Sequence, residues 1–203
     1  GYNCSKTVEK CLNSIVSQEF FGEIEIIYVD DASTDNSVSV CRRFFLEKNF
    51  TNFKIIVHEA NSGSPSAGRN RGVAESRGTY IFFCDADDFI VSDCLQRLFS
   101  LAEEHNSDYT VALHYQIRRY PDGDLQFQLN LCGLDSSDLP SVIIVDDAYL
   151  TRYLNEYFKF TRSYCLFEHC WGRLYRACVI KECSLLFEEE FDQLEDVMFN
   201  AQY

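Results

Sequence analysis

The sequence of 203 residues lacks the features of three classes of protein. No apolar run approaches the roughly 18 residues of a membrane-spanning helix, and the polar first residues do not resemble a secretory signal peptide. Basic charge is also scarce, because 18 Lys and Arg stand against 32 Asp and Glu and give a net charge of −14. We therefore expect no transmembrane segment, and no binding of nucleic acid or an anionic bilayer through the overall field.

The ten cysteines lack the paired CxxC spacing of zinc sites. Several of them, such as Cys11, Cys41 and Cys84, lie in apolar periodic segments. That placement is typical of buried free thiols in a reducing compartment, and not of a secreted disulfide framework. The cysteine pattern thus predicts a cytoplasmic protein.

What the sequence does contain is a short alternation of strand-like and helix-like segments over residues 1–113. β-Branched or apolar runs at 23–29, 53–59, 79–85 and 109–113 are separated by segments with helical periodicity. This pattern predicts an α/β fold with a doubly wound, mostly parallel sheet and helices on both faces. Beyond it, a Pro-Asp-Gly turn predicts a hairpin, and residues 146–158 are expected to be helical.

The start without Met and the last helical segment, which stops at Tyr203, predict a fragment trimmed at both ends.

Two acidic clusters follow predicted strands, Asp30-Asp31 and the DADD segment at 85–88. Ligands of open parallel sheets bind beyond the carboxyl ends of the strands, so we expect both clusters in one crevice. Two unit charges 4 Å apart repel by about 4 kcal/mol at an effective dielectric constant near 20, and a divalent cation would relieve this. The alternative is helix capping, which we favour for Asp35 and Asp93 and leave open for the Asp30-Asp31 pair.

Several segments, in order, carry a family resemblance: YN at 2–3, CLNSIVSQ, IIYVDDASTDNS, and NSGSPSAGRNRGVAESRGTYIFFCDADDF. From residue 2 to about residue 113 they resemble the N-terminal half of family 2 glycosyltransferases. The resemblance implies the GT-A fold and sugar transfer from a nucleotide donor. It also implies that the family's first strand, which precedes the YN segment, is missing here, because only Gly1 stands before Tyr2.

The resemblance also implies roles for the acidic residues and one arginine. Mg²⁺ or Mn²⁺ would be held by Asp87, with Asp88 beside it. For Arg69, the alternative to a role in donor binding is a position on the surface of a helix. The residues implied to bind the nucleotide sugar are Asp30, Asp31, Arg69 and Asp85.

The segment WGRLYRACVIKEC…LEDVMF resembles, more loosely, the acceptor-side part of bacterial capsule, teichoic-acid and exopolysaccharide enzymes. The resemblance implies that Asp196 is the catalytic general base, with Glu195 beside it. The alternative is an acidic first helical turn favoured by the helix dipole. Trp171 and His169 are candidates to line the acceptor site, and a place in an aromatic core is their alternative.

Taken together with the acidic clusters, the resemblance implies a metal-dependent, inverting glycosyltransferase. It would move a sugar from a nucleotide-diphosphate sugar, with UDP as the family's common nucleotide, to a saccharide or lipid-linked hydroxyl acceptor in surface polysaccharide synthesis. Residues 1–113 would form the donor half and residues 114–203 the acceptor side, in the cytoplasm or at the inner face of the membrane. The alternative is an inactive transferase-like domain that binds only a nucleotide sugar or a partner protein.

Overall fold

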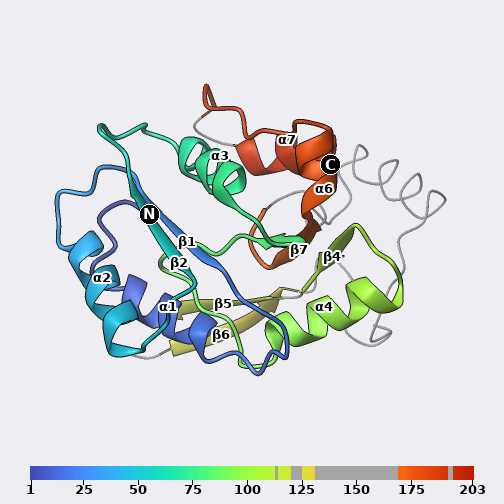
Figure 1. The fold of residues 1–203 in the computed structure, drawn as a ribbon, viewed down its shortest axis with the longest axis horizontal. Coiled ribbons are helices and arrows are strands. Elements are labelled where there is room, and N and C mark those ends of the chain that lie inside the picture. The colour runs from blue at the N-terminus through green and yellow to red at the C-terminus, as the bar shows by residue number, and fades with distance from the viewer. Residues whose placement is uncertain (113, 120–124, 131–168, 192–193) are drawn as a thin grey trace. The chain divides into compact units, whose positions relative to one another are not determined.

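The computed structural model describes residues 1–112, 114–119, 125–130, 169–191 and 194–203 (Figure 1). The chain divides into two compact units, Gly1–Ala112 with Cys170–Tyr203, and Leu113–His169. In the second unit, β5 (His114–Arg119) and β6 (Leu125–Asn130) form the antiparallel hairpin that the Pro-Asp-Gly turn predicts. The expected helix at 146–158 lies outside the described residues. The expected division at residue 113 into donor and acceptor halves stays a prediction.

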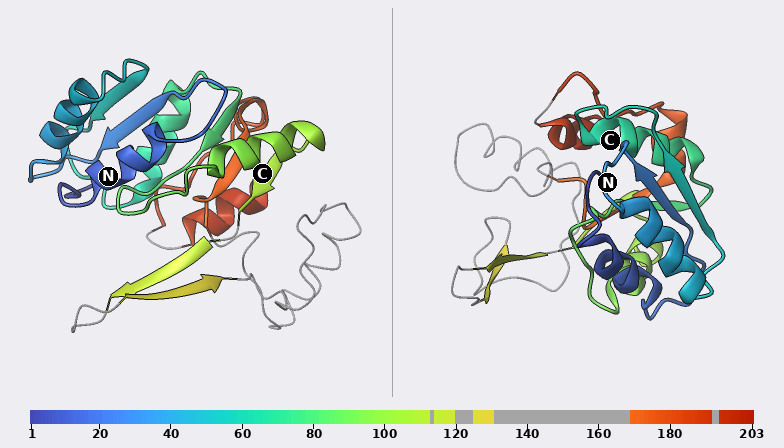
Figure 2. Two further views of the ribbon diagram at one scale, coloured as in Figure 1. Left: turned by 90° about the horizontal axis from the view of Figure 1, so that it is seen from below. Right: turned by 90° about the vertical axis from the view of Figure 1, so that its left-hand side faces the viewer.

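The first unit holds helices and short strands in alternation, and its C-terminal residues pack with its N-terminal ones (Figures 1 and 2). No helix among the described residues is long and apolar enough to cross a membrane. In chain order the elements are α1 (Val8–Val16), β1 (Ile26–Asp30), α2 (Ser37–Glu47), β2 (Phe53–Val57), α3 (Pro65–Glu75), β3 (Tyr80–Phe82), α4 (Cys94–Glu104), β4 (Tyr109–Val111), β7 (Arg173–Arg176), α6 (Ala177–Glu182) and α7 (Glu195–Gln202).

Strand β1 is covered by helices on both faces. It pairs in parallel with β2, and successive side chains of a strand point to opposite faces. Ile26 and Tyr28 pack with buried residues of α1 and α2. Val29 faces α3 on the other side, where Cβ atoms added at Gly68 and Gly72 would lie 3.9 and 4.0 Å from its methyl groups. The two glycines let α3 approach β1 closely, and this is the doubly wound arrangement expected from the sequence.

The second sheet differs from the parallel pairing expected for β3 and β4. Strand β7 lies between them and is antiparallel to both, with Ile81 opposite Tyr175 and Tyr109 opposite Tyr175. A segment from the C-terminal part of the chain therefore completes the sheet of the N-terminal part. One parallel bridge, between Phe83 and Trp171, extends the contact beyond β3.

The edge of β1 opposite β2 carries the first residue of the chain. The Gly1 amino group donates to the Val29 carbonyl at 2.6 Å, and the Gly1 carbonyl accepts from the Asp31 N–H at 2.9 Å. This is the hydrogen-bond pattern of a parallel bridge to Asp30. It lies where the resemblance implies the family's first strand, which itself stays a prediction.

Of the two aspartates predicted to cap a helix, one does so and the other does not. Asp35 accepts a hydrogen bond from the backbone N–H of Ser37 at 2.9 Å, so it caps α2 as expected. Asp93 stands at the N-cap position of α4, but its carboxylate accepts from Nε of Arg97 at 2.6 Å instead of from the helix backbone. The ion pair with Arg97 thus replaces the expected cap.

The cysteines among the described residues are all free thiols. Cys11 and Cys41 are buried, as the apolar patterning predicts, whereas Cys84 is only partly buried; Cys170 is buried as well. Cys178 and Cys183 are exposed on and beside α6, because that short helix buries only its opposite face.

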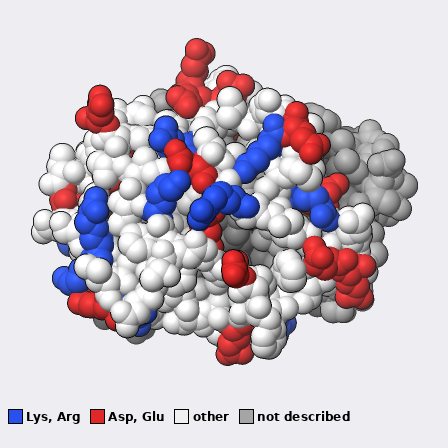
Figure 3. All heavy atoms as spheres, in the orientation of Figure 1, with Lys and Arg blue, Asp and Glu red and all other residues white. Residues whose placement is uncertain are grey.

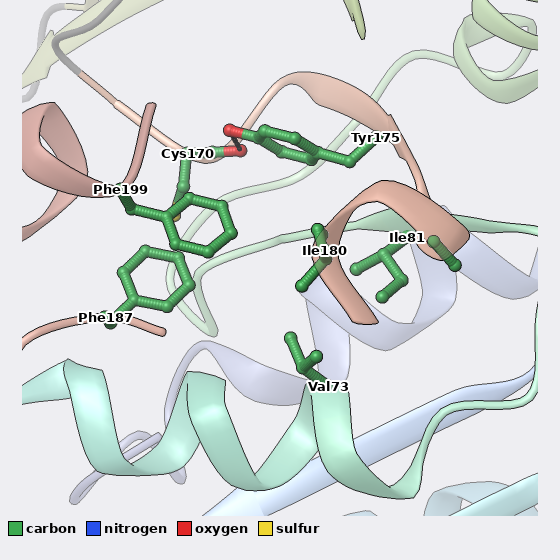
Figure 4. Packing of buried hydrophobic residues seen from close by; sticks show 8 residues of the cluster. Val73, Ile81, Cys170, Tyr175, Ile180, Phe187 and Phe199 are labelled. Atoms are coloured by element: carbon green, nitrogen blue, oxygen red, sulfur yellow. Dashed lines mark hydrogen bonds between the residues drawn. The ribbon is translucent and has the colours of Figure 1, made fainter. Parts of the chain in front are cut away.

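The largest buried cluster joins α3, β3, β7, α6 and α7 (Figure 4). Phe187 and Phe199 stack at its centre with 3.9 Å between ring centroids, and both are 1% exposed. The other buried members are Val73, Ile81, Cys170, Tyr175, Ala177 and Ile180. This cluster fixes α7, and hence Glu195 and Asp196, against the strands.

Replacing Phe199 by Ala tests this role of the cluster. We expect Phe199→Ala to lower the free energy of unfolding by about 3–5 kcal/mol, because a stacked and fully buried ring leaves a cavity. Denaturant unfolding measures the loss. The matched control is Phe21→Ala, since Phe21 is 97% exposed and its removal should change stability by no more than about 0.5 kcal/mol. Similar losses in both variants would show that the cluster does not hold the fold together.

Candidate active site

The carboxylate of Asp30, the last residue of β1, forms its hydrogen bonds with groups of β1 itself and of the turn that follows it. It is fully buried and accepts hydrogen bonds from the N–H of Ser33 at 2.8 Å, the Ser33 hydroxyl at 2.7 Å and the Tyr28 hydroxyl at 3.1 Å. Ala32, inside the turn, adopts a left-handed conformation with φ of 58°. These donors compensate the buried charge, and they fix the direction in which the chain leaves the sheet.

Asp31 lies at the same strand end and joins two other segments. Its Oδ1 lies 2.9 Å from Nδ1 of His58, the residue after β2, and Ser62 donates to the carboxylate from its N–H and its hydroxyl. Burial of the Asp31 carboxyl would raise its pKa, but the hydrogen bonds from His58 and Ser62 outweigh burial and lower it. Asp31 is therefore an anion held in a fixed orientation.

Helix α3 binds the segment that leads to α7. Asn70 donates from Nδ2 to the carbonyl of Phe187 and accepts from its N–H, both at 2.8 Å. The Ser66 hydroxyl donates to the carbonyl of Glu188 at 3.0 Å, and the Ser64 hydroxyl, at the N-cap of α3, lies 3.4 Å from the carbonyl of Phe191. The Gly/Ser-rich loop and α3 thereby place the C-terminal acids beside the N-terminal ones.

Arg69, on α3, is the junction of the candidate site. Its Nη1 donates to Oδ1 of Asp196 at 2.7 Å and to Oε1 of Glu195 at 3.0 Å, and its Nη2 donates to Oδ1 of Asp85 at 3.3 Å. Its side chain is only 11% exposed, and it lies over the ring of Phe187. The alternative position on the helix surface is therefore wrong, because Phe187, Glu195 and Asp196 contact Arg69 on this face of α3.

Glu195 and Asp196 do stand in the first turn of α7, as the dipole alternative requires. Both are buried, however, which a favourable dipole alone does not require. Burial raises the pKa of Asp196 and the charge of Glu195 adds to this, whereas Arg69 and hydrogen bonds from the backbone and thiol of Cys170 oppose it. The net direction is upward, so Asp196 is a stronger base than an ordinary aspartate.

The acidic segment at 85–88, which follows β3, is more exposed to solvent than Asp30 and Asp31 at the end of β1. Its backbone turns through a hydrogen bond from the N–H of Asp88 to the carbonyl of Asp85, and Asp87 and Asp88 are exposed. Partial removal of water from the Asp88 carboxyl, and then the charges of Asp85 and Asp87, raise its pKa to about 6. Among the described residues, no group of three or more His, Cys, Asp or Glu side chains is arranged to hold a metal by itself.

The structure thus brings Arg69, Asp85, Glu195 and Asp196 together. The end of β1 and the segment after β3 also approach each other, with Gly1 between them. A Cβ atom added at Gly1 would lie 3.1 Å from the hydroxyl of Tyr28 in β1 and 3.2 Å from Cβ of Ala86 after β3. The expectation that the Asp30-Asp31 pair and Asp87 with Asp88 share one crevice stays a prediction. On the face in Figure 3, basic and acidic side chains are interleaved, so the net charge of −14 is not a uniform field there.

The aromatic candidates and two overlooked residues complete the site. Trp171 is half-buried and bridges to Phe83, whereas His169 belongs to the second unit, so their roles as acceptor contacts stay predictions. Sequence reasoning missed His58 and Cys170. The position of His58 at the end of a predicted strand was the one signal that could have found it.

Solved structures show which class of protein shares this fold. TarS 1–349 from Staphylococcus aureus in complex with UDP-GlcNAc matches with a TM-score of 0.70 at 23% identity, over 100% of this chain and 50% of that one. The mannosyltransferase PcManGT from Pyrobaculum calidifontis, in complex with GDP-Man and Mn²⁺, matches with a TM-score of 0.63 at 15% identity, over 99% and 50%. The fold is that of the GT-A glycosyltransferases, which confirms the expected fold class.

The chain belongs to glycosyl transferase family 2, whose sequence profile matches residues 2–177. The poly(ribitol-phosphate) β-N-acetylglucosaminyltransferase TarS of S. aureus is 27% identical over 202 residues, 99% of this chain and 30% of that protein. The poly(ribitol-phosphate) β-glucosyltransferase of Bacillus spizizenii is 29% identical over 199 residues, 98% of this chain and 27% of that protein. The chain thus spans less than a third of these relatives, and the resemblance inferred from its motifs is confirmed.

Replacing Arg69 by Gln tests whether this arginine holds the carboxylates of the site together. We expect Arg69→Gln to lower the free energy of unfolding by about 3–5 kcal/mol at neutral pH, because buried carboxylates lose their cation. The pKa of Asp196 is raised by folding, so this carboxyl takes up its proton in the folded state before it does in the unfolded state. The loss should therefore shrink as the pH falls toward about 4, near the pKa of an unperturbed aspartate.

Denaturant unfolding across this pH range measures the effect. The matched control is Arg71→Gln, because the Arg71 side chain is 53% exposed and forms an ion pair with Glu75 on the same helix. An exposed pair of this kind contributes at most about 1 kcal/mol. Equal and pH-independent losses of unfolding free energy in the two variants would contradict this role of Arg69.

Proposed function

We propose that the chain carries the donor-binding and catalytic parts of an inverting glycosyltransferase that uses a UDP-sugar. The acceptor would be a hydroxyl group of a surface polysaccharide or glycoconjugate. The observation that carries the proposal is the contact of Arg69 with Asp85 on one side and with Glu195 and Asp196 on the other. It puts a donor-side acid and the candidate base within reach of one side chain. Family membership and the names of the relatives support the reaction class.

Asp196 is proposed as the general base. Its raised pKa suits proton removal near neutral pH better than an unperturbed value near about 3.9 would. Asp196 takes the proton of the acceptor hydroxyl while that oxygen forms a bond to the anomeric carbon. The bond from this carbon to the diphosphate oxygen breaks, and the nucleoside diphosphate leaves with the electron pair. Attack opposite the leaving group inverts the configuration.

Arg69 is proposed to hold the reacting groups in register. In the absence of a donor it compensates Asp196 and Glu195, and its Nη2 reaches Asp85. A diphosphate is a stronger partner for a guanidinium than an exposed carboxylate is, because it carries more negative charge and two of its oxygens can accept the parallel N–H groups of the planar guanidinium. Asp30 and Asp31, at the end of β1, are proposed to shape the nucleoside end of the same site.

Asp87 and Asp88 fit a divalent cation that arrives with the donor. Mg²⁺ and Mn²⁺ prefer oxygen ligands, and Mg²⁺ is commonly bound through one or two carboxylates together with substrate phosphates. Asp88 and Asp87 offer such oxygens. Partial burial raises the pKa of Asp88, and the charges of Asp85 and Asp87 add a repulsion that a cation would relieve. A bound cation would supply Lewis-acid stabilisation of the charge on the leaving diphosphate. Glu195, Trp171 and His169 are proposed for the acceptor side.

Replacing Asp196 by Asn tests the catalytic base. We expect Asp196→Asn to lower kcat by about 10²–10⁴-fold, because the amide cannot accept the proton. UDP affinity, measured by calorimetry, should change little. Sugar transfer is measured on the full-length protein with a panel of UDP-sugars, and Asp93→Asn is the control because Asp93 pairs with Arg97 on α4. Near-full turnover of Asp196→Asn would remove the base assignment, and donor binding without turnover in the wild type would favour the inactive alternative.

Replacing Asp87 by Ala tests the cation site. We expect the rate with Mg²⁺ or Mn²⁺ to fall more than about 100-fold, which corresponds to several kcal/mol of lost charge stabilisation. UDP affinity should fall in the presence of the metal and match the wild type in the presence of a chelator. Glu104→Ala, an exposed acid on α4, is the control. If the chelator leaves wild-type rate and donor affinity unchanged, the metal role is wrong.

A further inference from the structure

His58 and Asp31 form a pair at the carboxyl ends of neighbouring strands. In the parallel register of β1 and β2, Asp30 lies opposite Val57, so Asp31 and His58 are the next residues along each strand. The N–H of His58 donates to the carbonyl of Asp30 at 2.9 Å, which continues the strand pairing past the end of β2. Ligands of open α/β sheets bind at this edge. The pair therefore stands where the proposed function requires the nucleoside.

The Asp31 carboxylate has little capacity left to accept a hydrogen bond from a ligand. Its Oδ1 is approached by Nδ1 of His58 at 2.9 Å and by the N–H of Ser62 at 3.1 Å. Its Oδ2 is approached by the same N–H at 3.0 Å and by the Ser62 hydroxyl at 2.9 Å. A carboxylate offers about four lone-pair sites, so these contacts occupy nearly all of them. A donor group on a nucleobase needs another acceptor.

The contact with Asp31 fixes the tautomer of His58. An ionised carboxylate only accepts hydrogen bonds, so Nδ1 carries the hydrogen, and in the neutral ring Nε2 is then the acceptor. The lowered pKa of Asp31 agrees with this ionised state. The His58 side chain is 21% exposed, and no described residue forms a hydrogen bond with its Nε2. The outer nitrogen is thus oriented and accessible.

We propose that His58, oriented by Asp31, contacts the nucleobase of the donor and accepts a hydrogen bond from the imide N3–H of uracil through Nε2. In this arrangement Asp31 is a positioning residue, and Ser62 holds it in place from the Gly/Ser-rich loop. The inference rests on the proposed function, because it assigns the base-contacting atom of the same donor site. It adds a residue that the family motifs do not point to.

The test compares UDP with N3-methyl-UDP, which lacks the imide hydrogen, by calorimetry on the full-length protein. The wild type should bind UDP at least about threefold to tenfold more tightly than the methylated nucleotide, the range of one hydrogen bond. In His58→Asn the amide Nδ2 can still donate to Asp31, but nothing replaces Nε2. This variant should bind UDP more weakly and lose most of the preference. His105→Asn, an exposed histidine at the end of α4, should keep it.

The possible outcomes separate the two claims. If the wild type binds no uridine nucleotide, the UDP donor of the proposed function fails. If it binds both nucleotides equally, or if His58→Asn keeps the wild-type preference, another group reads the base and the assignment of His58 is overturned. If His58→Asn does not fold, the ¹⁵N resonance of His58 Nε2 in the wild type gives the answer. It should shift with UDP and stay in place with N3-methyl-UDP, and equal shifts with both would refute the proposal.

Discussion

The candidate site depends on one buried guanidinium. Arg69 draws together three acids from two segments, Asp85 after β3 and Glu195 with Asp196 at the start of α7. Without a cation, buried carboxylates so close in space would repel one another. A buried ion pair is nevertheless a weak source of net stability, because removing both partners from water costs about as much as their attraction returns. Arg69 therefore specifies where the acids lie, and the stacked pair Phe187 and Phe199 stabilises that arrangement.

Helix α3 carries this arginine to its place through features that are local in sequence. Gly68 and Gly72 let the helix approach Val29 of β1, and Ser64 caps its first turn. Asn70 then holds the backbone of Phe187 on the opposite side with two hydrogen bonds. One helix thus contacts the donor-side sheet with one face and the acceptor-side segment with another. The distance between the two halves of the proposed reaction is set by the width of α3.

The sequence predicts those parts of the fold whose signals are local. Strands β1 and β2 stand out as β-branched runs, and the positions of the acidic clusters after β1 and β3 follow from the chain direction. Strand β7 could not be predicted in the same way, because Arg173–Arg176 is too short to show a period and both its partners are distant in sequence. The burial of Arg69 was equally hidden, since the residues that cover it come more than a hundred positions later. His58 reads as an ordinary strand end until Asp31 is placed beside it.

The carboxylates of the site are distinguished by their partners more than by their positions. Asp30 is compensated by hydroxyl and N–H donors of its own turn, and Asp31 by His58 and Ser62, so both are fixed anions with structural duties. The charge of Asp196 is compensated by Arg69, and a diphosphate can compete for this guanidinium. The basicity of Asp196 can therefore respond to binding of the proposed donor. Among the described residues, no hydrogen-bond donor contacts the carboxylates of Asp87 and Asp88. Carboxylates that the protein leaves uncompensated are the ones that a charge from outside would stabilise, and this supports the proposed cation site at DADD, whereas the contact with Arg69 supports the proposed base at Asp196.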